Sequence, residues 1–506
     1  MPTGIQHVFV LMLENRSFDH MLGFADISGT DAVSGAPTQI SGLISPPAGA
    51  VTSNLYGGQQ FSVTQPADYA MPVDPGHEFP AVLEQLCGSG AVYAKGGAYP
   101  AILNSGFAAS YAAASAAVKV QSSPGEIMKC YNTASQLPVL NRLAEEFVVC
   151  DNWFSSMPGP TWPNRFFVHA ASSGGLDHSP STDEIVEWES IDGFSFSNGT
   201  IFDRLDKSGV KWRLYAGDDF PSVGALKGIK LTQVHGYDHF ADDVAQSGYP
   251  AAYTFIEPSY GHVVTDYKCG TSQHPLDDVT RGEMLIKCTY EAIRNSPLWD
   301  TSLLIITWDE HGGFFDHVAP PPAVAPADTT PTARNNQYGF TFEQYGVRVP
   351  AIVISPLIPG NLIDHRLYDH SSILATVEAC FGLYAMTERD ATANNLTPLL
   401  SSSSATDDAP AELPSPVSSG IGGCEPFSCS TPRTLESVPA ARPEDQINEG
   451  NLPGIMHSVL REDLALSPPD QREAIVRRFE TLRTRGDAWE YRNEVKEKIR
   501  AAREGP

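Results

Sequence analysis

The chain has 506 residues, a hydrophobic content of 42% and a formal net charge of −27. That length suffices for one large domain with an appendage, or for two or three ordinary domains. The acidic balance argues against a general binder of nucleic acid or of anionic membranes, because such proteins present basic surfaces. It suits a protein with a solvated acidic surface, or one that binds cations locally.

Short apolar runs alternate with amphipathic segments over residues 5–400, a pattern typical of an α/β domain. The runs have the length and flanks of strands that are buried on both faces of a parallel sheet. The predicted strands are 7–13, 147–154, 210–216, 252–258, 302–308 and 349–355. The predicted helices include 137–146, 200–209, 281–296 and 369–383. Asp369 stands where it could cap the last of these helices. We expect a doubly wound, mostly parallel sheet covered by helices.

The composition changes after residue 400. Residues 401–420 are rich in Ser, Pro and Ala, as linkers and flexible loops are. We therefore divide the chain into a main domain (1–400), a linker and loop region (401–468) and a C-terminal helical extension (469–506). An apolar stripe at helical spacing runs along the extension, formed by Ile475, Phe479, Leu482, Tyr491, Val495 and Ile499. The stripe predicts docking on the main domain or on a partner.

Eight cysteines are scattered without the CxxC spacing of a zinc framework. Cys424 and Cys429 are close enough in the sequence to form a small loop disulfide in an oxidising compartment. No run of about 20 apolar residues occurs, so we expect no transmembrane helix. The N-terminal residues lack the basic segment and cleavage site of an export signal. They predict a cytoplasmic protein as the chain is written, or a secreted one if a leader was removed.

Two predicted strands end in pairs of acidic or amide side chains. Glu14 and Asn15 follow residues 7–13, and Asp309 and Glu310 follow residues 302–308. Ligands bind beyond the carboxyl ends of strands in open α/β sheets, and carboxylate and amide oxygens suit hard cations. Either pair alone is typical of ordinary loop acids, but the two together indicate a metal site. The glycines at 312 and 313 would let the backbone pass close to such a site.

A hydroxyl group that could act as a nucleophile lies in the segment SSMPGPTWPNRFFVHAASSGG, residues 155–175. Thr161 stands between a Pro/Gly turn and a predicted helix (163–172), where an N-cap residue would be. The same position suits a phosphate, because helix N-termini present free amide groups. A metal beside it would lower the pKa of the hydroxyl and activate it for attack.

Four histidines stand in polar motifs. His77 and His274 are candidate catalytic groups, although a lone histidine is more often structural. We expect His311 and His317 to line the rim of the site. Asp19 and Asp316 are expected to hold histidines or turns in place.

Five motifs of this chain resemble the phosphoesterase family, which comprises bacterial phospholipases C, plant non-specific phospholipases C and related acid phosphatases. They are VLMLENRSFDHMLG (10–23), DPGHEF (74–79), MPGPTWPNRFF (157–167), QHPLDDVTRGE (273–283) and DEHGGFFDHVAPP (309–321). The resemblance spans roughly residues 5–385 in the same order. It implies an α/β fold similar to alkaline phosphatase, with residues 1–400 as the catalytic domain.

The resemblance also implies roles for single residues. A divalent metal ion would be held by Glu14, Asn15, Thr161, Asp309 and Glu310. Thr161 would also be the nucleophile, and His77 and His274 would contact the phosphoryl group or the leaving oxygen. Ca²⁺, Mg²⁺ or Mn²⁺ is expected ahead of Zn²⁺, because the ligand set is all oxygen. All five motifs end by residue 321, so residues up to about 400 are expected to hold every catalytic group.

The resemblance predicts a phospholipase C that forms a phosphothreonine and releases diacylglycerol and a phosphorylated head group, touching lipid surfaces at most transiently. A phosphomonoesterase with the same residues is the main alternative. A diester needs room for two substituents, and the width of the pocket cannot be predicted from the sequence. An inactive binding protein would have lost ligand or nucleophile positions, which are intact here. A sulfatase would need a CxPxR or SxPxR motif, which this chain lacks.

Aromatic residues close to the nucleophile in the sequence, Trp153, Phe154 and Trp162, have two interpretations. They could cage a choline ammonium through cation–π contacts. They are more often part of a hydrophobic core, which is the interpretation we favour.

Overall fold

The computed structural model describes residues 4–187, 191–261, 267–330, 332–400, 408–430, 442–448 and 450–504. A ten-stranded sheet runs through the molecule in the order β3-β2-β12-β6-β11-β10-β1-β9-β7-β8. Its strands are β1 (His7–Leu13), β2 (Ser28–Asp31), β3 (Pro37–Gln39), β6 (Val148–Cys150), β7 (Trp212–Ala216), β8 (Val234–Gly236), β9 (Tyr253–Glu257), β10 (Ser302–Trp308), β11 (Ala351–Ile354) and β12 (Leu362–Asp364). Most neighbours are parallel, while β11 runs antiparallel to β10 and β6, and β3 to β2. The predicted mostly parallel α/β sheet is confirmed.

The two central strands β1 and β10 agree with the strands predicted from the sequence. β1 and β10 have the predicted bounds and are almost wholly buried, as apolar runs without alternation require. They pair in parallel, with His7 opposite Ser302 and Leu13 opposite Trp308. This register places the residues that follow the two strands beside each other at one edge of the sheet.

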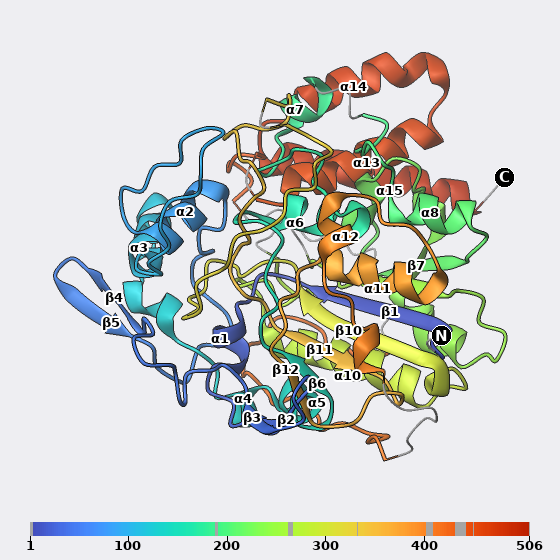
Figure 1. The fold of residues 1–506 in the computed structure, drawn as a ribbon. Coiled ribbons are helices and arrows are strands. Elements are labelled where there is room, and N and C mark those ends of the chain that lie inside the picture. The colour runs from blue at the N-terminus through green and yellow to red at the C-terminus, as the bar shows by residue number, and fades with distance from the viewer. Residues whose placement is uncertain are drawn as a thin grey trace.

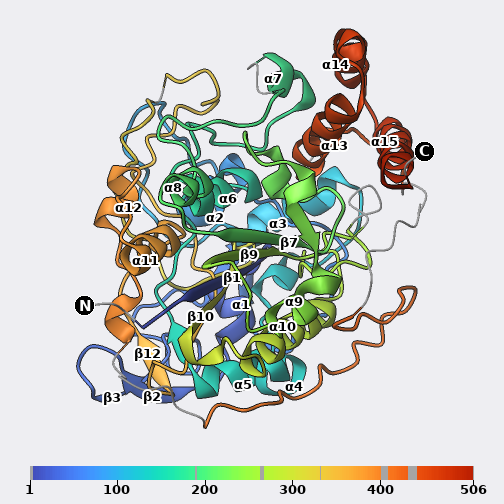
Figure 2. The same ribbon diagram turned by 90° about the vertical axis from the view of Figure 1, so that its right-hand side faces the viewer.

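Helices cover both faces of the sheet (Figure 2). One face carries α5 (Pro138–Glu146), α9 (Phe240–Val244) and α10 (Val279–Arg294), and the other α6 (Thr161–Ala170), α8 (Ile201–Lys207) and α11 (Ser371–Phe381). Peripheral elements are α1 (Phe18–Leu22), α2 (Phe79–Cys87), α3 (Phe107–Ala117), α4 (Thr133–Gln136), α7 (Thr182–Glu187), α12 (Glu388–Thr392) and the hairpin β4 (Ser53–Tyr56)–β5 (Gln59–Ser62). The predicted cap of α11 is wrong: His370 is the N-cap residue, and the Asp369 carboxylate instead accepts a hydrogen bond from Ser156 Oγ (2.8 Å).

Residues 408–430, here called the strap, run along α10 (Figure 2). Two disulfides fasten the strap to the main domain: Cys269–Cys424 and Cys288–Cys429. The Cys424–Cys429 loop disulfide that the sequence spacing allowed is therefore not formed. The two bonded pairs are separated by 155 and 141 positions in the sequence. The short distance in sequence between Cys424 and Cys429 therefore did not indicate how they pair.

Three helices end the chain and lie at one end of the molecule (Figure 1). They are α13 (Leu452–Leu466), α14 (Arg472–Glu480) and α15 (Arg485–Glu504). The prediction of linker and loop up to residue 468 is wrong for α13. The predicted docking of the apolar stripe on the main domain is confirmed, because its first five members belong to the same buried cluster as the sheet: Ile475, Phe479, Leu482, Tyr491 and Val495. Within the described ranges, no helix combines the length and apolarity needed to cross a membrane.

Candidate active site

The two acidic pairs meet where β1 and β10 end. Asn15 turns the chain in a left-handed conformation (φ +60°), which asparagine tolerates better than most residues. Its backbone N–H donates to Asp309 Oδ1 (3.1 Å), and its Nδ2 donates to Glu310 Oε1 (2.5 Å). Both pairs are fully buried. The structure thus brings together the four strand-end residues that the sequence predicted.

Gly312 and Gly313 allow the close approach that the sequence suggested. A methyl group built on Gly312 would overlap the Asn15 carbonyl oxygen, and one on Gly313 would stand 2.7 Å from Pro75 Cβ. Both glycines have positive φ. The N–H of Gly312 donates to Glu310 Oε2 (2.7 Å), so the glycine turn also orients that carboxylate.

Thr161 is the first residue of α6, the helix that Arg165 joins to Asp309. The turn before it is fixed by Asn164, whose Oδ1 accepts from Met157 N (3.1 Å) and whose Nδ2 donates to Gly159 O and Pro160 O (both 3.0 Å). Pro160 is the N-cap residue, so Thr161 is the first helical residue and not the cap that its position suggested. Its hydroxyl is free of the capping role and is buried.

Arg165 ties α6 to the strand ends and was not singled out from the sequence. Its Nε donates to Asp309 Oδ2 (2.8 Å) and its Nη2 to the Leu13 carbonyl oxygen (3.2 Å). Residues four apart lie on one helix face, so Thr161 faces the same way one turn earlier. That i, i+4 spacing within one motif is the signal from which Arg165 could have been found.

Burial and mutual repulsion disfavour the ionised forms of Glu14 and Asp309, which a bound cation would stabilise. Burial, followed by the charge of Asp309, raises the pKa of Glu14 well above its usual range. Burial also raises the pKa of Asp309 to about 6, although Arg165 opposes the shift. Glu310 adds a third buried carboxylate, and buried charges of one sign require a counter-ion.

Three oxygen atoms are available for such a cation. Among the described residues, Glu14 Oε2, Asn15 Oδ1 and Thr161 Oγ1 are buried and have no hydrogen-bond partner. Buried polar atoms are nearly always paired, and exceptions concentrate at functional sites. Carboxylate, amide and hydroxyl oxygens are ligands that hard divalent cations prefer. The donor set therefore fits the predicted metal ion.

His77 interacts electrostatically with Glu310 and Asp309, and His274 with His77. Burial alone would lower the pKa of His77, but Glu310, Asp74, Glu78 and Asp309 outweigh it and raise the pKa to about 9. Burial, reinforced by the charge of His77, lowers the pKa of His274 well below its usual range. The His274 ring stacks on Tyr267 at 3.5 Å between centroids, and Arg16 Nη2 donates to its carbonyl oxygen (3.3 Å).

The expected rim positions of His311 and His317 are wrong, since both side chains are buried. His311 Nε2 is 2.8 Å from Gln85 Oε1. His317 Nδ1 is 2.7 Å from Asp19 Oδ2, and Val318 N donates to Asp316 Oδ1 (2.9 Å), as expected for acids that hold a histidine and a turn. These two acids and His317 also have metal-like spacing, but Arg348 donates to Asp316 Oδ1 (2.9 Å) and Asp19 Oδ1 (3.0 Å) and supplies the positive charge.

The aromatic residues near the nucleophile belong to the core. Trp153, Phe154 and Trp162 are at most 2% exposed, and Trp153 stacks on Tyr368. The favoured core interpretation is confirmed.

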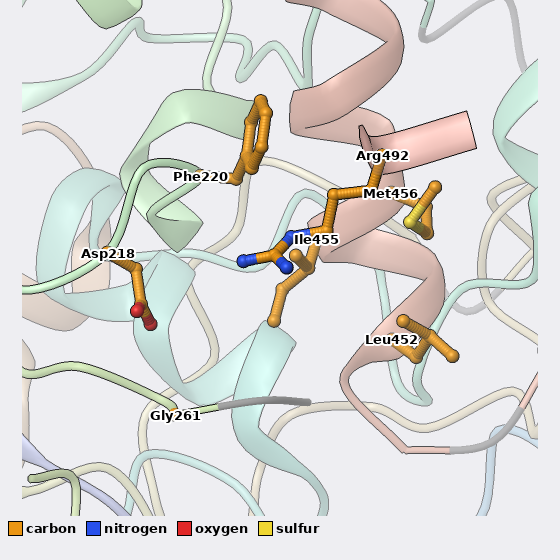
Figure 3. A pocket seen from close by; sticks show the side chains of 7 residues that line it. All are labelled: Asp218, Phe220, Gly261, Leu452, Ile455, Met456 and Arg492. Atoms are coloured by element: carbon orange, nitrogen blue, oxygen red, sulfur yellow. The ribbon is translucent and has the colours of Figure 1, made fainter. Parts of the chain in front are cut away.

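One residue of the site comes from the C-terminal helices. Asn451 Nδ2 donates to Glu14 Oε1 (2.8 Å). The helix that follows Asn451 also lines a small cavity of about 10 Å³, which lies between α13, Arg492 of α15 and the loop of Asp218 and Phe220 (Figure 3). The expectation that residues up to about 400 hold every catalytic group stays a prediction, because Asn451 contacts a candidate ligand and is not itself one. No motif in the sequence indicated this contact.

Comparison with known proteins agrees with these motifs. The sequence model of the Phosphoesterase family matches residues 5–384. Non-specific phospholipase C3 of Arabidopsis thaliana is 33% identical over 429 residues, covering 81% of this chain and 76% of that protein. Non-specific phospholipase C6 of the same plant is 35% identical over 408 residues, covering 76% and 70%. Phospholipase C B of Mycobacterium tuberculosis is 27% identical over 432 residues, covering 78% and 77%.

Solved structures give weaker likenesses. A protein of the alkaline phosphatase superfamily from Vibrio parahaemolyticus aligns with a TM-score of 0.33 at 13% identity, covering 52% of this chain and 65% of that one. Murine ectonucleotide pyrophosphatase/phosphodiesterase 5 aligns with a TM-score of 0.33 at 10% identity, covering 52% and 95%. Both scores are below 0.5, so the assignment rests on the sequence comparisons. They cover most of the chain and include every strand-end motif: the chain belongs to the Phosphoesterase family.

Proposed function

We propose that the protein is a metal-dependent phospholipase C that cleaves a phospholipid into diacylglycerol and a phosphorylated head group. The observation that carries the proposal is the Thr161 hydroxyl, buried and unpartnered among the described residues at the start of α6. Arg165, one turn later on α6, donates to Asp309 Oδ2 (2.8 Å), which ties the helix that Thr161 begins to the carboxylate cluster. The names of the plant and mycobacterial relatives supply the substrate class.

Glu14, Asn15, Asp309, Glu310 and Thr161 would hold the metal, which we propose to be Ca²⁺, Mg²⁺ or Mn²⁺ because every donor is an oxygen. The bound cation would withdraw charge from the phosphoryl oxygens and lower the pKa of the threonine hydroxyl.

The chain's own residues account for the remaining steps. The free N–H groups at the start of α6 bind a phosphoryl oxygen, because helix N-termini favour anions. Thr161 loses its hydroxyl proton to solvent, and Oγ1 forms a bond to phosphorus in line with the P–O bond to the alcohol, which breaks; the product on the enzyme is a phosphothreonine. His77, held among carboxylates, donates the proton that the alcohol oxygen needs. Water then cleaves the phosphothreonine and regenerates the hydroxyl.

A choice of chromogenic substrates tests the diester specificity. We expect faster turnover of p-nitrophenylphosphorylcholine than of p-nitrophenyl phosphate, because a phospholipase C must accommodate two substituents on phosphorus. Release of diacylglycerol from phosphatidylcholine vesicles, followed by chromatography, checks the natural bond. Preference for the monoester together with no diacylglycerol would replace the proposal by an acid phosphatase with the same residues.

Metal removal tests the cation. Chelation should abolish turnover, and adding back Ca²⁺, Mg²⁺ or Mn²⁺ should restore it. Asp309→Asn should raise the metal dissociation constant by at least about tenfold, because one anionic ligand is lost. Asp300→Asn, at an exposed acid beside the same strand, is the matched control. Full activity in protein shown to be metal-free by elemental analysis would contradict the proposal.

A further inference from the structure

The C-terminal segment returns to the carboxylate cluster through one buried side chain. Asn451 precedes α13, is 3% exposed and lies 437 positions from Glu14 in the sequence. Its Nδ2 donates to Glu14 Oε1 (2.8 Å). The side chain makes no capping hydrogen bond to α13, although asparagine is a good N-cap residue. Its observed partner is therefore the carboxylate and not its own helix.

The hydrogen bond distinguishes the two oxygens of Glu14. Oε1 is occupied by Asn451, whereas Oε2 is buried and has no partner among the described residues. A hydrogen bond from an amide to an ionised carboxylate is stronger than one between neutral groups, and it fixes the rotation of the carboxylate. Asn451 thus leaves one oxygen, Oε2, directed for another ligand.

The position of Asn451 is fixed by the way α13 packs. A methyl group built on Gly454 would overlap the indole of Trp162, the residue after Thr161. Ser458 Oγ donates to the Pro221 carbonyl oxygen (3.2 Å) and Arg461 Nη1 to that of Leu226 (2.8 Å). Figure 3 shows the Ile455 side chain and the guanidinium of Arg492 lying between α13 and the loop of Asp218 and Phe220. The first turn of α13 therefore lies against the first turn of α6.

We propose that Asn451 is a positioning residue for the metal site, so that the C-terminal helices complete it. Asn451 does not touch the cation; it holds Glu14 Oε1 and orients Oε2 as the ligand atom. The inference rests on the proposed function, because it assumes that Glu14 binds the metal. Partners that orient a ligand commonly change metal affinity by about 10- to 100-fold when they are removed.

Metal titration of the full-length, metal-stripped protein tests the proposal. In Asn451→Ala and in the similarly sized Asn451→Leu, we expect the dissociation constant for Mn²⁺, measured by calorimetry, to rise by at least about tenfold. The Mn²⁺ concentration for half-maximal turnover should rise in parallel, while kcat at saturating Mn²⁺ stays close to that of the wild type. Ser458→Ala is the control, because it removes a hydrogen bond of the same helix away from the carboxylates.

Thermal unfolding in EDTA separates positioning from structure. We expect Asn451→Ala and Ser458→Ala to have similar melting temperatures without metal, and Asn451→Ala to gain less stability when Mn²⁺ is added. An unchanged Mn²⁺ affinity in both Asn451 variants would overturn the inference, with or without a lower melting temperature. That outcome leaves the proposed function intact as long as the wild type still needs the metal. A wild type that binds no Mn²⁺, Mg²⁺ or Ca²⁺ would refute the proposed function itself.

Discussion

Replacing Thr161 tests whether its hydroxyl oxygen is the nucleophile. Thr161→Ala should lower kcat by at least about a thousandfold, because loss of a nucleophile removes an interaction made only during reaction. Folding should be kept, since the hydroxyl has no hydrogen-bond partner among the described residues. Steady-state kinetics and circular dichroism measure the two effects. Thr161→Ser should retain measurable turnover, and Thr392→Ala, at an exposed threonine, should be silent. A near-normal rate in Thr161→Ala would exclude the assignment.

His178 gives the stability of the protein a predictable dependence on pH. Its Nδ1 is 3.1 Å from Asp177 Oδ1 and its Nε2 is 3.2 Å from Glu184 Oε1. Burial alone would lower the pKa of His178, but these two bonds raise it from its ordinary 6.5 to about 9. A raised pKa means that the protonated form stabilises the fold fully below pH 6.5 and that this contribution is lost as the pH rises through about 9.

The measurement is denaturant unfolding of His178→Gln beside the wild type. The difference in unfolding free energy should be largest near about pH 6 and should shrink toward about pH 10. The pKa of Glu184, which burial raises and His178 lowers, falls to about 2, so Glu184 remains charged across this range. His239→Gln, at a largely exposed histidine, is the control for replacing a histidine. A difference that is constant with pH would mean that folding does not shift the pKa of His178.

At the scale of elements, the contact between α13 and α6 depends on a glycine. Gly454→Ala would force the backbone of α13 away from Trp162, because there is no room for the added methyl group. We expect a lower melting temperature and weaker Mn²⁺ binding, since Asn451 moves with the helix. Gly248→Ala is the matched control, because a methyl group there meets no atom within 4 Å. Equal metal affinity in the two variants would show that Asn451 does not depend on this packing.

The strap provides a second prediction for elements. Replacing both Cys288 and Cys429 by serine should lower the unfolding free energy by roughly 2–4 kcal/mol, because the disulfide restricts the unfolded chain. Thiol titration of the denatured wild type should find four free cysteines before reduction and eight after it. Cys87→Ser, at a free cysteine, is the control.

Because disulfides persist in oxidising compartments, we also propose that the protein works in one. Eight free thiols in protein purified without reductant would contradict both the two disulfides and the proposed oxidising compartment.

These elements also show what the sequence can reveal. β1 and β10 were predicted to the residue because buried strands are continuous apolar runs, and the acids at their ends followed from the strand positions. α13 was not predicted, because Pro453 and Gly454 stand in its first turn and a Ser/Pro-rich segment precedes it. The contact between Asn451 and Glu14 and the two disulfide pairings join distant parts of the chain, and local patterns carry no information about such pairs.

For the whole molecule, the net charge of −27 should govern its approach to lipid surfaces. Adding a phosphorus-free anionic amphiphile to phosphatidylcholine vesicles should slow hydrolysis, and salt should relieve the effect by screening the repulsion. Turnover of a soluble diester at each salt concentration is the control for effects on the active site. Faster hydrolysis on the anionic vesicles would reveal a basic surface that the overall charge conceals.

The strap also sets the length of the tether that holds the last three helices. With both disulfides closed, the covalent attachment to the main domain that is nearest to α13 in the sequence is Cys429; with both reduced, the only covalent connection is the polypeptide chain that leaves the main domain near residue 400. A shorter tether keeps a higher effective concentration of α13 at its binding surface. Undocked helices would therefore be recaptured faster in the oxidised protein than in the reduced one. The redox state of Cys269, Cys288, Cys424 and Cys429 would therefore change the fraction of molecules in which the hydrogen bond between Asn451 and Glu14 is broken.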